Sequence, residues 1–91
     1  MTDGKVMDYL KTHEKVKNIV KKKAFDDAYC CVKVDDVANE LGIDSKTAKV
    51  HLDLMEIDEF GSYVDREQEV FCSMDGIERL RNRFKKKLAQ E

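Results

Sequence analysis

Two lysines and two hydroxyl side chains stand close together near the middle of the chain, directly after an aspartate that can cap a helix. The four side chains are Ser45, Lys46, Thr47 and Lys49, and the capping residue is Asp44. At the start of a helix the backbone amides point outward beside such hydroxyl groups, which suits phosphate oxygens. Lysines can contact phosphate or guanine. The residue types in this segment are therefore suited to contacts with phosphate groups.

Catalysis finds little support in the sequence. There is no paired nucleophile and base, no glycine-rich phosphate loop and no cluster of metal ligands. The two histidines have no ligand-like spacing to the three cysteines, and these five residues are His13, His51, Cys30, Cys31 and Cys72. An odd number of cysteines without an export signal predicts reduced thiols rather than a disulfide framework. We expect no enzyme activity, no metal and no cofactor.

The candidate binding residues belong to a pattern of two helices joined by a tight turn, over residues 34–59. Val37, Ala38 and Leu41 give the first helix one apolar face, and the small Ala38 suits a close helix crossing. Gly42 allows the left-handed backbone that the exit from a helix needs. The pattern therefore predicts a helix-turn-helix.

The flanking elements follow from the spacing of apolar residues. Apolar side chains three and four positions apart predict a long helix over residues 3–25, and β-branched, aromatic and small residues predict a short strand over 29–34. Residues 61–73 have apolar ends and a polar middle, as a β-hairpin would. Ser73 can cap a last amphipathic helix over residues 74–90. The sequence thus predicts one α+β domain over residues 1–91.

Charge is distributed unevenly along the chain. The formal net charge is −2, but residues 1–34 carry +3 and residues 61–91 carry +1. Residues 35–60, the helix pair itself, hold eight acids against Lys46 and Lys49 and so carry −6. An acidic surface opposes a polyanion. The distribution of charge is therefore awkward for a protein that reads DNA.

The order helix, strand, helix, helix, hairpin, helix resembles the winged helix-turn-helix. The chain is similar to small prokaryotic, particularly archaeal, transcriptional regulators of that family. The resemblance covers nearly the whole chain and is strongest at VANELGIDSKTAKVHL, residues 37–52. CSMDG, residues 72–76, resembles the Leu-Thr-x-x-Gly that opens the final helix in several regulator families.

This resemblance implies a sequence-specific DNA-binding transcriptional regulator whose second motif helix, the recognition helix, enters the major groove of double-stranded DNA. That helix is expected to bury Ala48, Leu52 and Met55 and to turn its other side outward. The hairpin, or wing, is expected to reach the minor groove or the backbone. The expected DNA contacts are Ser45, Lys46, Thr47, Lys49, Val50, Arg66, Gln68 and Lys33.

A second interpretation comes from Val50, Leu54 and Ile57, which lie largely opposite the buried side of the recognition helix. The long first helix can cover this apolar stripe, or another protein can contact it. Together with the charge of −6, the stripe motivates an alternative function. In that alternative the chain is a winged-helix protein–protein interaction module of a transcription or other assembly, with little DNA binding.

The terminal helices suggest a homodimer, because both are amphipathic and the first is longer than a minimal winged helix requires. Alternatively, their apolar stripes close the core of a single chain, since a chain this small needs most of its apolar residues inside. The residues expected at a dimer or partner interface are Val6, Leu10, Leu54, Ile57, Ile77, Leu80, Phe84 and Leu88.

The resemblance also implies that the first strand pairs with the last strand of the hairpin, which brings Cys30 or Cys31 near Cys72. Such a thiol pair can sense oxidants where a nearby cation lowers a thiol pKa. No apolar run is long enough for a signal peptide or a membrane span. We therefore expect a cytoplasmic protein that makes no membrane contact.

Overall fold

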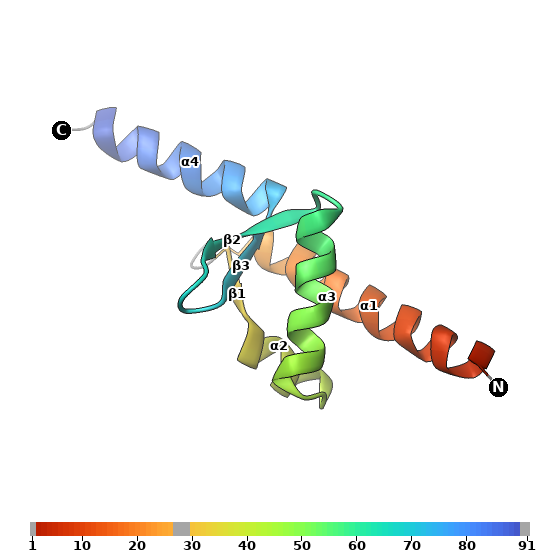
Figure 1. Ribbon diagram of the computed structural model, residues 1–91. Helices are drawn as coiled ribbons and strands as arrows, with labels where there is room; N and C mark the ends of the chain where they lie inside the picture. The colour runs from red at the N-terminus through yellow and green to blue at the C-terminus, as the bar shows by residue number, and fades with distance from the viewer. Residues whose placement is uncertain (1, 27–29, 90–91) are drawn as a thin grey trace.

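The computed structural model describes the backbone of residues 2–26 and 30–89 and the side chains of residues 7–26 and 30–89. Over this part of the chain, four helices surround a three-stranded antiparallel sheet in the order β1-β3-β2 (Figure 1). The elements are α1 (Thr2–Ala24), β1 (Val32–Lys33), α2 (Val34–Leu41), α3 (Ser45–Ile57), β2 (Gly61–Asp65), β3 (Val70–Ser73) and α4 (Met74–Ala89). The expected α+β class and the expected order of elements are confirmed.

The first strand is shorter than predicted. β1 pairs with β3 as expected, but only Val32 and Lys33 take part, opposite Phe71 and Val70. Lys33 is extended at the N-cap of α2, and the backbone already turns into that helix at Val34. The predicted strand over residues 29–34 is therefore wrong in length because helix α2 begins inside it, and its first residue lies outside the described residues.

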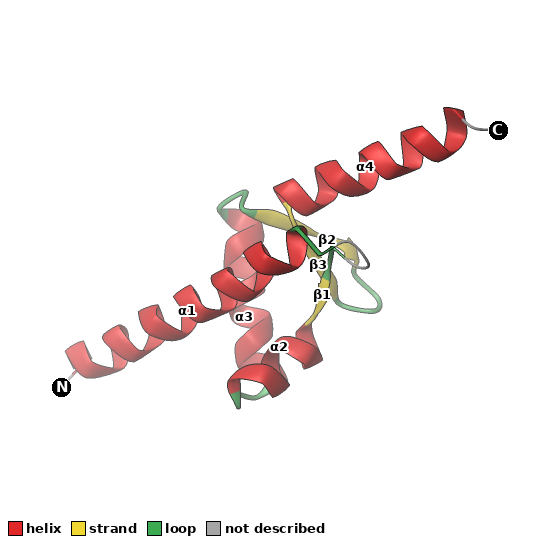
Figure 2. Ribbon diagram, turned by 180° about the vertical axis from the view of Figure 1, so that it is seen from behind, coloured by secondary structure: helices red, strands yellow, loops and turns green. Residues whose placement is uncertain are grey.

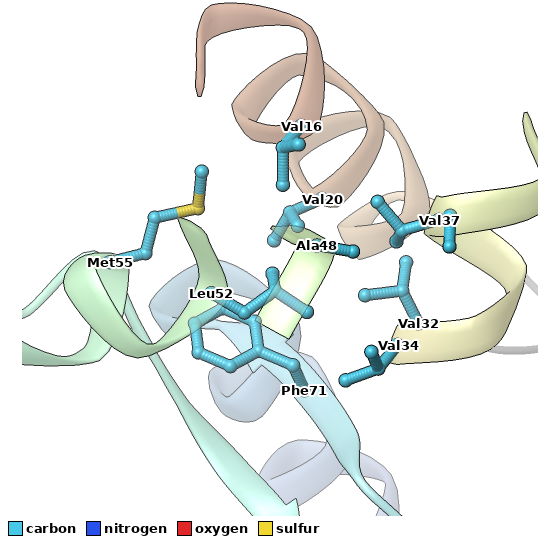
Figure 3. Packing of buried hydrophobic residues seen from close by; sticks show 10 residues of the cluster. Val16, Val20, Val32, Val34, Val37, Ala48, Leu52, Met55 and Phe71 are labelled. Atoms are coloured by element: carbon cyan, nitrogen blue, oxygen red, sulfur yellow. The ribbon is translucent and has the colours of Figure 1, made fainter. Parts of the chain in front are cut away.

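One apolar core joins α1, α2, α3 and β3. Ala48, Leu52 and Met55 of α3 are fully buried, as predicted. Figure 3 shows Leu52 beside the Phe71 ring of β3, with Val20 of α1 nearby. Burial of such side chains is the main term that favours folding, at about 25 cal/mol per Å² of apolar surface. The packing leaves the opposite side of α3 facing solvent.

Three predicted helix boundaries are confirmed, whereas α1 begins and ends one residue earlier than the predicted range 3–25. Gly42 has a left-handed φ of 66° after α2, which suits its lack of a side chain. The Asp44 carboxylate accepts a hydrogen bond from the Thr47 backbone N–H at 2.7 Å. The Thr47 side chain first, and this backbone bond second, lower the pKa of Asp44. At α4, the Ser73 hydroxyl accepts from the Gly76 backbone N–H at 3.1 Å. Local sequence signals thus set these three boundaries.

The contact between α1 and α3 contains two histidines. Nδ1 of His13 and Nδ1 of His51 lie 2.9 Å apart, and the Tyr9 ring lies 4.6 Å from the His51 ring between centroids. His51 is fully buried, and its Nε2 has no hydrogen-bond partner among the described residues. Burial lowers the pKa of His51, and the neighbouring His13 lowers it further.

We expect the protein to lose stability as pH falls below about 6.5, the ordinary pKa of histidine. The unfolded chain binds a proton at His51 that the folded chain resists, so the stabilisation is complete above that pH and is lost as pH drops through the folded pKa. Each unit of depression corresponds to about 1.4 kcal/mol. Urea unfolding at about pH 7.5 and about pH 5.5 measures the effect.

The control is His51→Leu, in which the difference in unfolding free energy between the two pH values is expected to shrink. The carboxylates with lowered pKa, Asp44 and Glu56, titrate below this range, since ordinary carboxyl pKa values are about 4. An equal pH dependence in His51→Leu would contradict the assignment.

The two terminal helices leave the core in opposite directions, so the molecule is about 60 × 20 × 20 Å (Figures 1 and 2). Of the residues expected at an interface, Leu10, Phe84 and Leu88 are more than half exposed. Ile77 and Leu80 instead pack against the cysteine cluster of the same chain. The side chain of Val6 lies outside the described residues. Among the described helices, none combines the length and apolar character that crossing a membrane requires.

The three cysteines are buried free thiols at the junction of β3, β1 and α4. Sγ of Cys31 lies 3.1 Å from Sγ of Cys72, and the Cys72 thiol donates to the Cys30 carbonyl at 3.0 Å. The expected proximity is therefore confirmed. Burial raises the pKa of both Cys31 and Cys72. A raised pKa disfavours the reactive thiolate, so this environment does not favour oxidant sensing.

Candidate nucleic-acid interface

The outward side of α3 carries the residues that the sequence singled out. Ser45, Lys46, Lys49 and Val50 are exposed, whereas Thr47 is half-buried and belongs to the N-terminal cap. The Ser45 hydroxyl donates to the Asp35 carboxylate of α2 at 2.6 Å, which ties the two helices together at this end. The first turns of α3 therefore form a polar, solvent-facing surface with two lysines.

Tyr63 of β2 brings the hairpin and α3 together. The Lys49 ammonium lies 5.8 Å from the centroid of the Tyr63 ring, and the Arg66 guanidinium lies 5.5 Å from it. Both distances are within the range of cation–π attraction. Two cations from distant parts of the chain thus meet over one aromatic ring. They line a shallow hollow of about 160 Å³ together with Glu69.

The Asp53 carboxylate of α3 binds both Lys49 and Tyr63. Lys49 donates to Asp53 at 3.3 Å, and the Tyr63 hydroxyl donates to the other oxygen of the same carboxylate at 2.7 Å. Burial and this bond to Asp53 raise the pKa of Tyr63. The positive charge of Lys49 is therefore already partly neutralised by the protein itself.

Glu56 plays the same part for the arginine. The Arg66 guanidinium donates to both Glu56 oxygens, at 2.9 and 3.1 Å. Glu56 also accepts from the Tyr63 backbone N–H at 3.0 Å and from the Ser62 hydroxyl at 2.9 Å. These hydrogen bonds, the backbone one first, lower the pKa of Glu56. The carboxylate therefore stays charged and fixes β2 against α3.

The remaining predicted contacts lie around this centre. Lys33 is exposed immediately before α2, and Gln68 is exposed in the hairpin turn, where its backbone N–H donates to Asp65 at 2.9 Å. Neither Lys33 nor Gln68 joins the cluster over Tyr63. The structure brings together Lys49 and Arg66, while Ser45 and Lys46 stand one turn further toward the start of α3.

Sequence reasoning missed Tyr63, Asp53 and Glu56 as organisers of this surface. Tyr63 follows Glu56 by seven positions and Asp53 by ten, and the end of α3 and a turn lie between them. Such a spacing fits neither the helical nor the strand period. The pairing becomes visible only when β2 folds back on α3.

The apolar stripe of α3 is not covered by the part of the chain that the structure describes. Val50, Leu54 and Ile57 are all exposed, and Ile57 is 75% exposed. The alternative in which α1 covers the stripe is therefore wrong, because α1 packs against the His51 side of α3. The surface of α3 thus combines two lysines, several acids and three apolar side chains.

No protein-family model, no curated protein and no solved structure matches this chain.

Proposed function

We propose that this chain is a winged helix-turn-helix protein that binds double-stranded DNA sequence-specifically and regulates transcription as a homodimer. In this proposal α3 is the recognition helix and the β2–β3 hairpin is the wing. The observation that carries the proposal is the convergence of Lys49 and Arg66 over Tyr63. A DNA backbone that passes between a recognition helix and a wing meets positive charge from both at that point.

The internal ion pairs are compatible with this function because they are exchangeable. Arg66 is exposed beside Glu56, and Lys49 is exposed beside Asp53. Exposed pairs of this kind contribute about 0–1 kcal/mol, so a phosphate can replace a carboxylate as partner. The first turns of α3 then supply Lys46 and the Ser45 hydroxyl for phosphate or base contacts. Val50 adds an apolar contact on the same side.

The test is fluorescence anisotropy with random and genomic-fragment duplexes over a salt series, with the protein and its Lys46→Glu/Lys49→Glu variant. We expect binding that weakens with salt, and a loss of at least about a hundredfold in the variant, because each reversal both removes a phosphate contact and adds repulsion. The matched control is Lys11→Glu/Lys15→Glu, which changes the same charges on the exposed side of α1.

The comparison between the two double variants shows whether α3 contacts the DNA. Loss of binding in the α3 variant alone supports the recognition helix. Equal loss in both variants, or no binding by the unaltered protein at low salt, would rule out α3 as the DNA-contacting surface.

The exposed stripe of Val50, Leu54 and Ile57 favours one alternative, a winged-helix module that contacts another protein in a transcription or other assembly. Leu54→Ser/Ile57→Ser separates the two functions. DNA affinity that survives this double variant supports a DNA reader, whereas affinity for a partner protein that is lost in it supports the alternative. Both side chains are exposed, so we expect the fold to persist.

A further inference from the structure

The second half of α4 lies outside the core of the chain. Ile77 and Leu80 are the last side chains of α4 that pack against the buried cysteines, and every described residue from Arg81 to Ala89 is exposed. Phe84 is 66% exposed and Leu88 is 55% exposed. A helical segment this short is marginal in water without tertiary contacts. We call residues 81–89 the arm. Its exposed apolar side chains and lack of core contacts are typical of a helix that packs against another surface.

Three exposed apolar side chains of α4, Met74, Phe84 and Leu88, fall on one side of the helix together with the half-buried Ile77. With Arg81 at the position between Ile77 and Phe84, these residues form a stripe and follow one another at spacings of three, four, three and four. This is the heptad spacing of helices that pair along their length. Met74 is exposed as well, so the stripe reaches solvent at both ends of the helix.

Charge is polarised along the same helix. The first turns of α4 carry two acids, Asp75 and Glu78. The rest of the helix carries only cations, which are Arg79, Arg81, Arg83, Lys85, Lys86 and Lys87. Two such helices side by side in parallel would place cations against cations. In antiparallel orientation Lys85, Lys86 and Lys87 of each helix lie opposite the first turns of the other, which carry Asp75 and Glu78, and the helix dipoles also oppose favourably.

A hollow lies beside the base of α4. It has a volume of about 220 Å³ and is lined by Lys21, Glu59, Phe60, Ser73, Met74 and Asp75. Phe60 and Met74 give it apolar surface, while Glu59 and Asp75 are acidic. Phe84 lies ten residues after Met74, about 15 Å along the same helix, so the arm cannot fold back into the hollow of its own chain.

We propose that two copies of this chain pair through antiparallel α4 helices about a two-fold axis. Leu88 of each copy then docks at the hollow beside Phe60 and Met74 of the other, Phe84 packs along the first turns of the partner helix, and the last-turn lysines of each arm face the acids at the other base. Each arm meets the same surface on its partner, so the contact closes as a dimer. This pairing extends the proposed homodimer but does not depend on DNA binding.

Sedimentation velocity of the full chain without DNA tests the pairing. We expect the protein to sediment as a dimer, at twice its mass of 10.6 kDa, at tens of micromolar. Phe84→Ser/Leu88→Ser is expected to be a monomer that still unfolds cooperatively in urea, because both side chains lie outside the core. Leu10→Ser removes an equally exposed leucine from α1 and serves as the matched control, which should remain a dimer.

A charge exchange makes the antiparallel direction testable. Glu78→Lys and Lys85→Glu should each weaken the dimer by about tenfold or more, and the double exchange should restore it, because the two positions face each other only across an antiparallel pair. A monomer at several hundred micromolar, or a dimer that Leu10→Ser breaks and Phe84→Ser/Leu88→Ser leaves intact, would overturn the proposal. Because no DNA is present, either result leaves the proposed DNA interface to its own test.

Discussion

Replacing Asp53 with Asn and Glu56 with Gln should tighten DNA binding roughly thirtyfold at low salt. The two carboxylates hold Lys49 and Arg66 by ion pairs of 3.3 and 2.9 Å. Their removal frees both cations for phosphate and takes two negative charges away from the duplex. At about 1 kcal/mol for each charged contact, the pair of changes amounts to roughly 2 kcal/mol.

Fluorescence anisotropy over a salt series measures both parts of this expectation. Each additional phosphate contact should steepen the logarithmic salt dependence by about 0.9, so two contacts should steepen it by roughly 1.8. The amides can keep the hydrogen bonds that the carboxylates accept from the Tyr63 hydroxyl and backbone N–H. We therefore expect the hairpin to stay in place against α3.

Asp8→Asn/Glu14→Gln is the matched control, because it makes the same two chemical changes on exposed residues of α1. Its effect on DNA affinity should be small. Equal tightening by the two double variants would mean that overall charge, rather than release of Lys49 and Arg66, governs binding. Unchanged affinity in Asp53→Asn/Glu56→Gln would remove these two cations from the interface.

Leu52→Ala should cost about 2–5 kcal/mol of unfolding free energy. Leu52 is fully buried and packs in the core that also contains Phe71 and Met55. Truncation removes apolar burial and leaves a cavity among side chains that come from several elements and cannot all move inward. Since a domain of this size is stable by only about 5–15 kcal/mol, the variant should be close to unfolding. Urea unfolding followed by circular dichroism measures the change.

Leu10→Ala is the control for this prediction, since it makes the same truncation at a side chain that is 53% exposed. Surface substitutions of this kind usually change stability by about 0.5 kcal/mol or less. Both proteins should be compared at low concentration, where self-association contributes little. A loss of similar size in the two variants would contradict the burial of Leu52 as the cause.

Local signals in the sequence were enough for the order and most boundaries of the elements. Gly42, Asp44 and Ser73 act within four residues of their own position, so their effect does not depend on distant parts of the chain. The buried face of α3 followed from the resemblance to the winged helix, and the burial of Ala48, Leu52 and Met55 confirms it. The length of β1 was overestimated because it does not depend on local signals alone. Pairing with β3 and the start of α2 set that length.

Composition and periodicity by themselves therefore determined the α+β class, the helix pair and the candidate lysines. Tertiary structure alone decided that Lys49 and Arg66 meet over Tyr63, that acids of α3 already hold both, and that the apolar stripe of α3 stays exposed. It also decided that the arm of α4 leaves the core while Ile77 and Leu80 remain in it. These outcomes depend on how α3, the hairpin and the terminal helices pack together, and pairings between residues distant in sequence leave no local pattern to read.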